Sequence, residues 1–178
     1  MRRFILTLFM SACAFGADTT SVSRTMLTAV EKHLDDKITR LWEDNVVTLT
    51  GQTRGIYLDN YGVVFSAEIN LVMGPPFTLV RPIPNKDEIV KHRLKKLDRL
   101  PELKKAMRKS LLDVAATLDT VPAEEQIVFV AFLAKYPWEE TNGLPVQVML
   151  RGQKKKLLEL MRGPSTPELE AAIQITQN

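Results

Sequence analysis

Two histidines and their acidic neighbours are the residues of this chain that could hold a metal or move a proton. His33 lies near Asp35 and Asp36, and His92 lies near Glu88. A histidine and an acid one helical turn apart can share a metal ion. The same pairs are also typical of a solvated helix surface, which is the interpretation we favour. The chain contains no HExxH, paired CxxC, EF-hand, GxSxG or phosphate-binding glycine motif, so we expect no cofactor, no metal and no catalytic residue.

A second arrangement keeps an enzyme as the alternative. Glu68 and Asp59 could act as the acid and base of a small hydrolase if the fold placed a histidine beside them. Glu68, however, falls within a run of alternating apolar and polar residues, where an acidic residue is usually the solvent-facing member. The sequence therefore favours a protein that binds or assembles over one that catalyses a reaction.

Four aromatic residues at predicted turns and loops could anchor a partner. Tyr57 and Tyr61 flank a predicted turn, and Tyr136 and Trp138 lie in a predicted connection between strands. Large rings at such places either contact a partner or cover the end of a core, and the second role is the more common. If the chain has a partner-binding site, we expect it where these two loops meet.

The region 91–109 is rich in basic residues and is predicted to be helical. A helix of this kind could contact anionic lipid or cell-wall polymers, as a membrane-surface adaptor would. Nucleic acid is a poor candidate partner, because the helix has no aromatic residue on which bases could stack. A solvated helix face is the interpretation we favour. The residues expected to meet an anionic surface are Lys91, Arg93, Lys95, Lys96, Lys104, Lys105 and Arg108.

Residues 1–17 have the layout of a secretory signal peptide. Arg2 and Arg3 precede an apolar run at 4–10, which is too short to span a bilayer, and small residues follow it. Cys13 is the one cysteine of the chain. It is either lost with the leader or, in a lipobox-like MSAC sequence, becomes the lipidated first residue. We expect export to the periplasm or the extracellular space, with a lipoprotein as the second option.

Composition agrees with one globular domain over residues 18–178. Apolar residues make up 45% and charged residues 25% of the 178 residues, which are ordinary values. The net charge of +3 falls to +1 without Arg2 and Arg3, so it is no argument for a nucleic-acid partner. A mature chain without cysteine cannot rely on disulfides and must be held by its core.

Changes of hydrophobic period predict the elements. The region 22–42 has helical spacing, with Thr20 or Ser21 as its cap. The region 87–119 also has helical spacing, and Pro101 inside it either kinks one long helix, the interpretation we favour, or starts a second helix. Asp59-Asn60 is the turn of a hairpin. Strands are expected at 46–58, 61–72, 126–134 and 144–152, and loops at 74–85 and 135–143. Short helices are expected at 154–161 and beginning at 165–168, where a cap-like residue precedes Pro167, and the C-terminus is expected to fray.

These elements predict an α+β fold. Two hairpins form a single antiparallel sheet of about four strands, and 126–134, apolar on both faces, is its central strand. The long N-terminal helix, the long kinked central helix and the short C-terminal helices pack on this sheet.

The stretches TRGIYLDNYGVVFSAEINLV and YPWEETNGLPVQV, with the basic helix between them, carry one resemblance. Over about residues 45–160 the chain resembles a family of uncharacterised exported bacterial proteins. No activity is attached to that family, so the resemblance implies export and no functional residues. The function expected is an exported cell-envelope domain that binds an unknown protein or envelope component.

Overall fold

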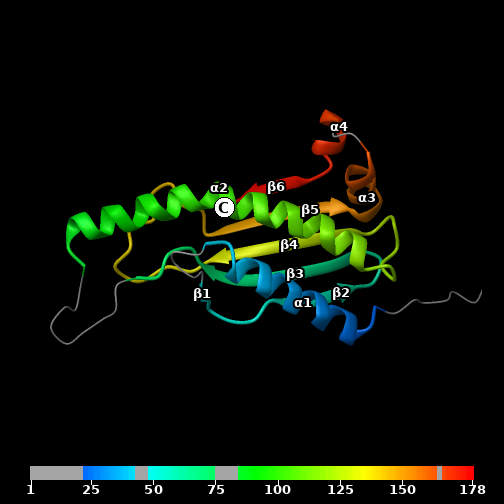
Figure 1. The fold of residues 1–178 in the computed structure, drawn as a ribbon, viewed down its shortest axis with the longest axis horizontal. Helices are drawn as coiled ribbons and strands as arrows, with labels where there is room; N and C mark the ends of the chain where they lie inside the picture. The colour runs from blue at the N-terminus through cyan, green and yellow to red at the C-terminus, as the bar shows by residue number, and fades with distance from the viewer. Residues whose placement is uncertain (1–21, 43–47, 75–83, 164–165) are drawn as a thin grey trace, which may run out of the picture.

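The computed structural model describes residues 22–42, 48–74, 84–163 and 166–178 (Figure 1). The predicted leader and Cys13 lie outside the described residues. In chain order the elements are α1 (Arg24–Thr39), β1 (Thr48–Leu49), β2 (Arg54–Leu58), β3 (Gly62–Asn70), α2 (Lys86–Thr117), β4 (Gln126–Leu133), β5 (Gln147–Gln153), α3 (Lys154–Arg162), α4 (Pro167–Glu170) and β6 (Gln174–Gln177). Among these described helices, none is both long enough and apolar enough to cross a membrane.

All six described strands belong to one sheet, in the order β1-β3-β4-β5-β6, with β2 also paired to β3. β1 and β2 pair with different ends of β3 on the side away from β4, so the strands fill five rows. β3 and β4 are parallel, whereas the other pairs are antiparallel. The α+β class, the β2–β3 hairpin and the central place of β4 are confirmed. The prediction of about four strands in an all-antiparallel sheet is wrong, because the sheet is mixed and has additional edge strands.

The parallel pair follows from the path of α2. β4 begins at Gln126 beside Gly62, the first residue of β3, so the chain must return to the end of the sheet where β3 began. The 32 residues of α2 make this return, over about 48 Å at 1.5 Å per residue. A strand has the same side-chain period in either orientation, so the pattern of 126–134 could not distinguish a parallel neighbour from an antiparallel one.

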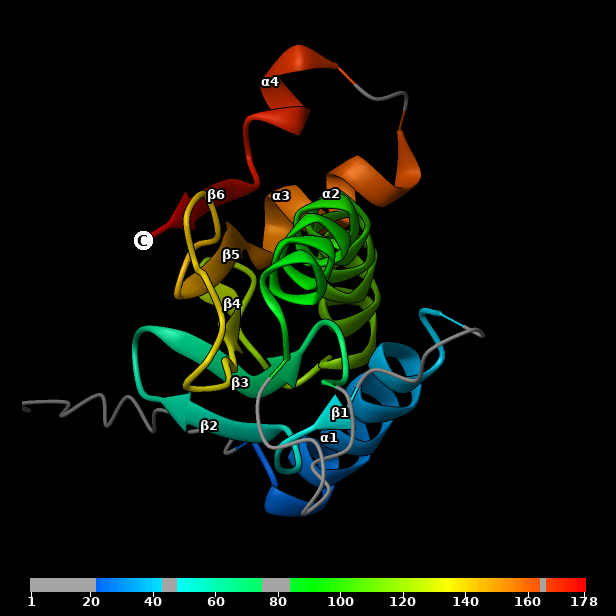
Figure 2. The same cartoon turned by 90° about the vertical axis from the view of Figure 1, so that its left-hand side faces the viewer.

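The helices cover one face of the sheet, and no described helix lies on the other (Figure 2). Along each central strand, every second side chain points to the covered face and is buried among residues of α1 and α2. These side chains form the core with the apolar stripes of the helices. The core includes Leu34, Phe65, Ile69, Leu103, Met107, Leu111, Ile127, Phe129 and Leu150.

The two long helices differ from expectation in detail. α1 begins after Ser23, whose side chain accepts a hydrogen bond from the Met26 amide, so the predicted caps at Thr20 or Ser21 are wrong. α2 begins with a capping box of Asn85 and Glu88 and continues through Pro101. The single long helix is confirmed, and a kink at Pro101 stays a prediction. The strand expected at 46–58 is interrupted at residues 50–53.

The exposed edge of β2 is closed by side chains of α1. The Gly55 amide donates to Glu31 Oε1 at 2.7 Å, and the Gly55 carbonyl accepts from Arg24 Nη1 at 2.8 Å. Arg24 also forms an ion pair with Glu31 at 2.7 Å. These side chains take the place of a neighbouring strand, so Gly55 cannot pair with another chain.

The C-terminus is ordered in a way that the sequence did not predict. Residues 174–177, expected to fray, form β6 and pair antiparallel with β5, where Ile175 lies opposite Leu150. The short helix α4 begins at Pro167, as the sequence predicted.

The turn before β3 depends on glycine at position 62. Asn60 has a φ of 62°, which confirms the predicted Asp59-Asn60 turn, and Gly62 has a φ of 128°. A Cβ at Gly62 would lie 1.9 Å from the Gln126 carbonyl oxygen of β4. We expect Gly62→Ala to lower the free energy of unfolding by about 2–3 kcal/mol or more, because the substitution adds backbone strain to a steric clash.

Denaturant unfolding of Gly62→Ala beside Gly51→Ala measures this effect. A Cβ at Gly51 meets nothing within 4 Å, so this control should change stability by no more than about 0.5 kcal/mol. Equal effects of the two substitutions would contradict the account of the turn.

Candidate functional site

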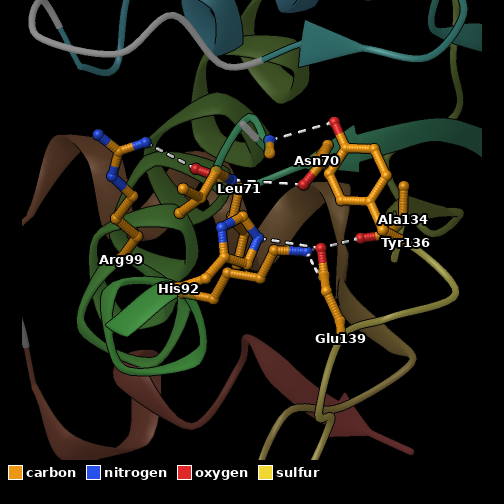
Figure 3. A network of polar contacts seen from close by, with 10 residues as sticks. Asn70, Leu71, His92, Arg99, Ala134, Tyr136 and Glu139 are labelled. Carbon is orange, nitrogen blue, oxygen red and sulfur yellow. Dashed lines mark hydrogen bonds and ion pairs between the residues drawn. The ribbon is translucent and has the colours of Figure 1, made fainter. Parts of the chain in front are cut away.

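A cluster of buried charges joins the first turns of α2 to residues 134–146, the segment that connects β4 to β5 (Figure 3). The side chains of Lys96 and Glu139 are 4% and 2% exposed, and that of His92 is 7% exposed. Lys96 Nζ donates to Glu139 Oε2 at 2.6 Å and to the Ala134 carbonyl at 3.0 Å. His92 Nε2 lies 3.0 Å from Glu139 Oε1. Both carboxylate oxygens of Glu139 therefore have partners.

Aromatic rings cover this cluster. Tyr136 and Trp138 stack with ring centroids 5.3 Å apart and planes 6° apart, and the His92 ring meets Trp138 edge to face at 5.0 Å. The Gly74 amide donates to the Tyr136 hydroxyl at 3.2 Å, and a Cβ at Gly74 would lie 2.8 Å from the Tyr136 ring. Tyr136 and Trp138 thus pack beside His92 and Gly74, and their role in binding a partner stays a prediction.

Arg99 extends the same buried line of α2. Its guanidinium donates to the Leu71 carbonyl at 2.7 Å and lies 4.7 Å from the ring centroid of Trp42. His92, Lys96 and Arg99 are spaced by about one helical turn. Arg99 and Lys96 bond to carbonyls just beyond β3 and β4, and His92 and Lys96 bond to Glu139 in the segment after β4.

The pKa values in the cluster reflect burial and hydrogen bonds acting in opposite directions. Burial alone would raise the pKa of Glu139, but the hydrogen bonds from His92 and Lys96 outweigh it, so the pKa of Glu139 lies below its ordinary value of 4.5. For Lys96 burial is the larger effect, and the pKa of this ammonium is lowered from 10.5 although Glu139 opposes the shift.

The cavity beside this cluster is small. It has a volume of about 70 Å³, and its walls come from Leu71, Lys96, Leu133, Glu139 and residues 144–146 among others. Sites for small molecules commonly measure roughly 300–1,000 Å³. Among the polar residues that line the cavity, Lys96 and Glu139 already bond to each other, and Lys135 and Thr141 are exposed residues of its rim. We therefore interpret the cluster as the element that fixes the 134–146 segment.

The two aromatic loops do not meet. Tyr57 and Tyr61 flank the turn at the start of β3, whereas Tyr136 follows the end of the parallel strand β4, about 30 Å away along nine residues. The prediction of a binding site between the two loops is therefore wrong. Tyr57 is half-buried with its hydroxyl 3.1 Å from Glu125 Oε1, while Tyr61 is exposed.

The groups of the hydrolase alternative are also separate. Asp59 and Glu68 are both exposed at different ends of β3, about 20 Å apart over six residues of strand. His33 is exposed on α1, and the acid beside His92 is Glu139, which the sequence analysis missed. Within the described parts of the chain, no three His, Cys, Asp or Glu residues form a group that could hold a metal ion.

The basic residues of α2 do not form one surface. Lys96 is buried, Arg93 lies 3.9 Å from Glu140, and Arg108 pairs with Glu170. Lys95 and Lys104 are half-buried, which leaves Lys91 and Lys105 as the exposed members of the predicted set.

The uncovered face of the sheet presents a different kind of site. Ile56 is 56% exposed, Leu58 42% and Phe132 44%, all on the face opposite the helices. Val64, Val130 and Met149 lie between them on the same face and are half-buried. The sequence predicted these strands but did not single out these residues as a site. Together they form an apolar surface that extends from the edge strand β2 across β3 to β4 and β5.

No family model, curated protein or solved structure matches the chain. The resemblance to exported bacterial proteins therefore stays a prediction, and the function has to be argued from this geometry.

Proposed function

We propose that this protein is an exported binding or assembly domain of the bacterial envelope, and that it works through the uncovered face of its sheet. The observation that carries the proposal is the exposure of Ile56, Leu58 and Phe132 on one side of a well-packed sheet. Transfer of a side chain of this size from water into an interface contributes about 1.5–3 kcal/mol. Covering this face therefore favours association.

Binding is supported over catalysis by the arrangement of the polar groups. The charges that are buried together, Lys96, Glu139 and His92, bond to one another. The acids proposed for a hydrolase point into solvent at opposite ends of a strand. The exposed apolar face, in contrast, has a clear use as an interface.

The envelope address rests on the leader at residues 1–17. Mass spectrometry of the protein from its native host should find a chain that begins at lipidated Cys13 or within a few residues after it. A chain that retains Met1 would contradict export, and with it the envelope part of the proposal.

A native gel of the envelope fraction tests the binding surface. We expect the wild-type protein to migrate as part of a larger complex, and Ile56→Lys/Phe132→Lys to migrate as the free chain. Lys105→Glu, on the exposed side of α2, is the matched control and should migrate like wild type. An unchanged complex in the double variant, or free migration of the wild type, would rule the proposal out.

A further inference from the structure

The geometry points to a second copy of this chain as the partner that covers the uncovered face, in a symmetric dimer. This inference rests on the proposed function and names its partner. In an isologous dimer the same patch meets itself, so the patch must be apolar along the two-fold axis and complementary on either side of it.

The strand registers define an apolar band that crosses the face diagonally. Ile56, Val64 and Val128 are paired neighbours on β2, β3 and β4, and Val130 pairs with Met149 of β5 one level further along. Val128 is only 2% exposed, so the accessible apolar area of the band lies mainly on Ile56, Leu58 and Phe132. Successive residues on this face of a strand lie about 6.8 Å apart, and neighbouring strands about 4.8 Å. The band therefore runs from Leu58 at one corner of the face to Phe132 and Met149 at the other.

Charges of opposite sign lie on the two sides of this band. Glu68 lies on β3, one strand and two residues from Val130, and Arg151 lies on β5 at the same offset in the opposite direction. Each is about 8 Å from Val130 in the plane of the sheet. A two-fold axis that runs along the band over Val130 therefore places Glu68 of one copy on Arg151 of the other. Two such ion pairs enclose the apolar contact.

The surface around Arg151 is hollowed to receive such a side chain. Arg151 borders a polar depression of about 410 Å³, and its Nε donates to Gln174 Oε1 at 2.8 Å. Tyr61 lies on the same wall and is exposed, so it would meet the second copy. Glu68 is exposed on the other side of the band, so the face offers both an acidic side chain and Arg151 to its own copy. Glu124 also lines the recess beside Arg151, where its carboxylate accepts a hydrogen bond from Gln153 Nε2 at 2.8 Å.

The size of the face fits a dimer interface. Five rows of strands and seven residue levels measure about 24 Å by 24 Å, or about 600 Å² in flat projection. Because side chains project from the sheet, the solvent-accessible area of the face is larger than this flat projection. It approaches the approximately 800 Å² that each partner buries in a standard interface. The face carries few charges, and they are of both signs, so electrostatic repulsion between two copies is small. These charges are Arg54, Glu68 and Arg151.

Charge reversal tests this inference in protein expressed with its own leader and purified from the envelope. Sedimentation velocity across micromolar concentrations should show a dimer for the wild type. Glu68→Arg and Arg151→Glu should each raise the dissociation constant at least tenfold, and the double variant Glu68→Arg/Arg151→Glu should restore the dimer. Lys105→Glu should leave it unchanged, and circular dichroism checks that each variant is folded.

Monomeric wild-type protein at every concentration would overturn the dimer, and so would a double variant no better than the single ones. Failure of the dimer and failure of the proposed function are distinguishable. If the wild type is monomeric but Ile56→Lys/Phe132→Lys still releases the chain from its native complex, the face binds a different protein and only the dimer is wrong.

Discussion

Lys96→Met lowers the free energy of unfolding by about 3–5 kcal/mol, because it leaves the Glu139 carboxylate buried without its cation. Lys96 and Glu139 are almost fully buried, and Lys96 also satisfies the Ala134 carbonyl. Denaturant unfolding measures the loss. Lys91→Met, an exposed lysine of the same helix, is the matched control and should cost no more than about 0.5 kcal/mol.

The double variant Lys96→Met/Glu139→Gln separates a coupled pair from two independent side chains. An amide at position 139 carries no charge and still reaches His92, so the double variant should be more stable than Lys96→Met alone. Additive losses in the two single variants would contradict a coupled pair.

The same pair predicts a dependence on pH. The pKa of Glu139 is lowered in the folded protein, so its contribution is present above about pH 4.5 and is lost as the pH falls through the folded-state value. The difference in stability between wild type and Glu139→Gln should therefore shrink in acid. A difference that stays constant below pH 4.5 would show that this carboxyl is not held ionised by its partners.

Lys154→Met lowers the free energy of unfolding by about 3 kcal/mol, because it removes the donor of three backbone carbonyls, two of them in buried hydrogen bonds. Lys154, at the start of α3, donates to the carbonyls of Leu118 at 2.6 Å, Asp119 at 3.2 Å and Val121 at 2.6 Å, just beyond the end of α2. Burial lowers the pKa of Lys154, although Asp119 opposes the shift. The charge nevertheless lies where the helix dipole favours a cation.

Two further variants define this role. Lys154→Arg should not restore stability, because a planar guanidinium cannot direct donors to three oxygens around one point. Lys156→Met, at an exposed position of the same helix, should change stability little. A loss for Lys156→Met as large as that for Lys154→Met would contradict the proposed contacts.

Local patterns predicted most of the elements, and long-range contacts account for the differences. The helical spacing of α1 and α2 and the Asp59-Asn60 turn are features of neighbouring residues, so the sequence could reveal them. The parallel pairing of β3 with β4 depends on where a 32-residue helix returns the chain. The spacing of apolar residues within one element does not reveal where the chain returns.

The first third of α2 also shows that local sequence patterns do not reveal which side chains are buried. Val90 and Leu94 share the helical spacing of the apolar residues of α2, but both are exposed, and His92, Lys96 and Arg99 are buried instead. Helical spacing counted back from Leu103 does lead to residues 99, 96 and 92, so the signal was present. That spacing alone does not reveal the buried cluster, because basic residues usually face solvent and the acidic partner Glu139 is distant in the sequence.

The candidate site was the least predictable part. Ile56, Val130 and Phe132 were recognised as strand residues, but an apolar residue on a strand can face a helix or solvent. Which face stays uncovered depends on the crossover of α2 and on the docking of α1 beside β2. Those contacts exist only in the folded chain.

Photo-crosslinking in the native host tests the central claim, that the uncovered face of the sheet carries the partner. A photoreactive amino acid is placed at position 56 on that face and, in a separate strain, at position 105 on the exposed side of α2. The account predicts a crosslinked product from Ile56 and none from Lys105. No product from position 56, or the same product from both positions, would contradict it.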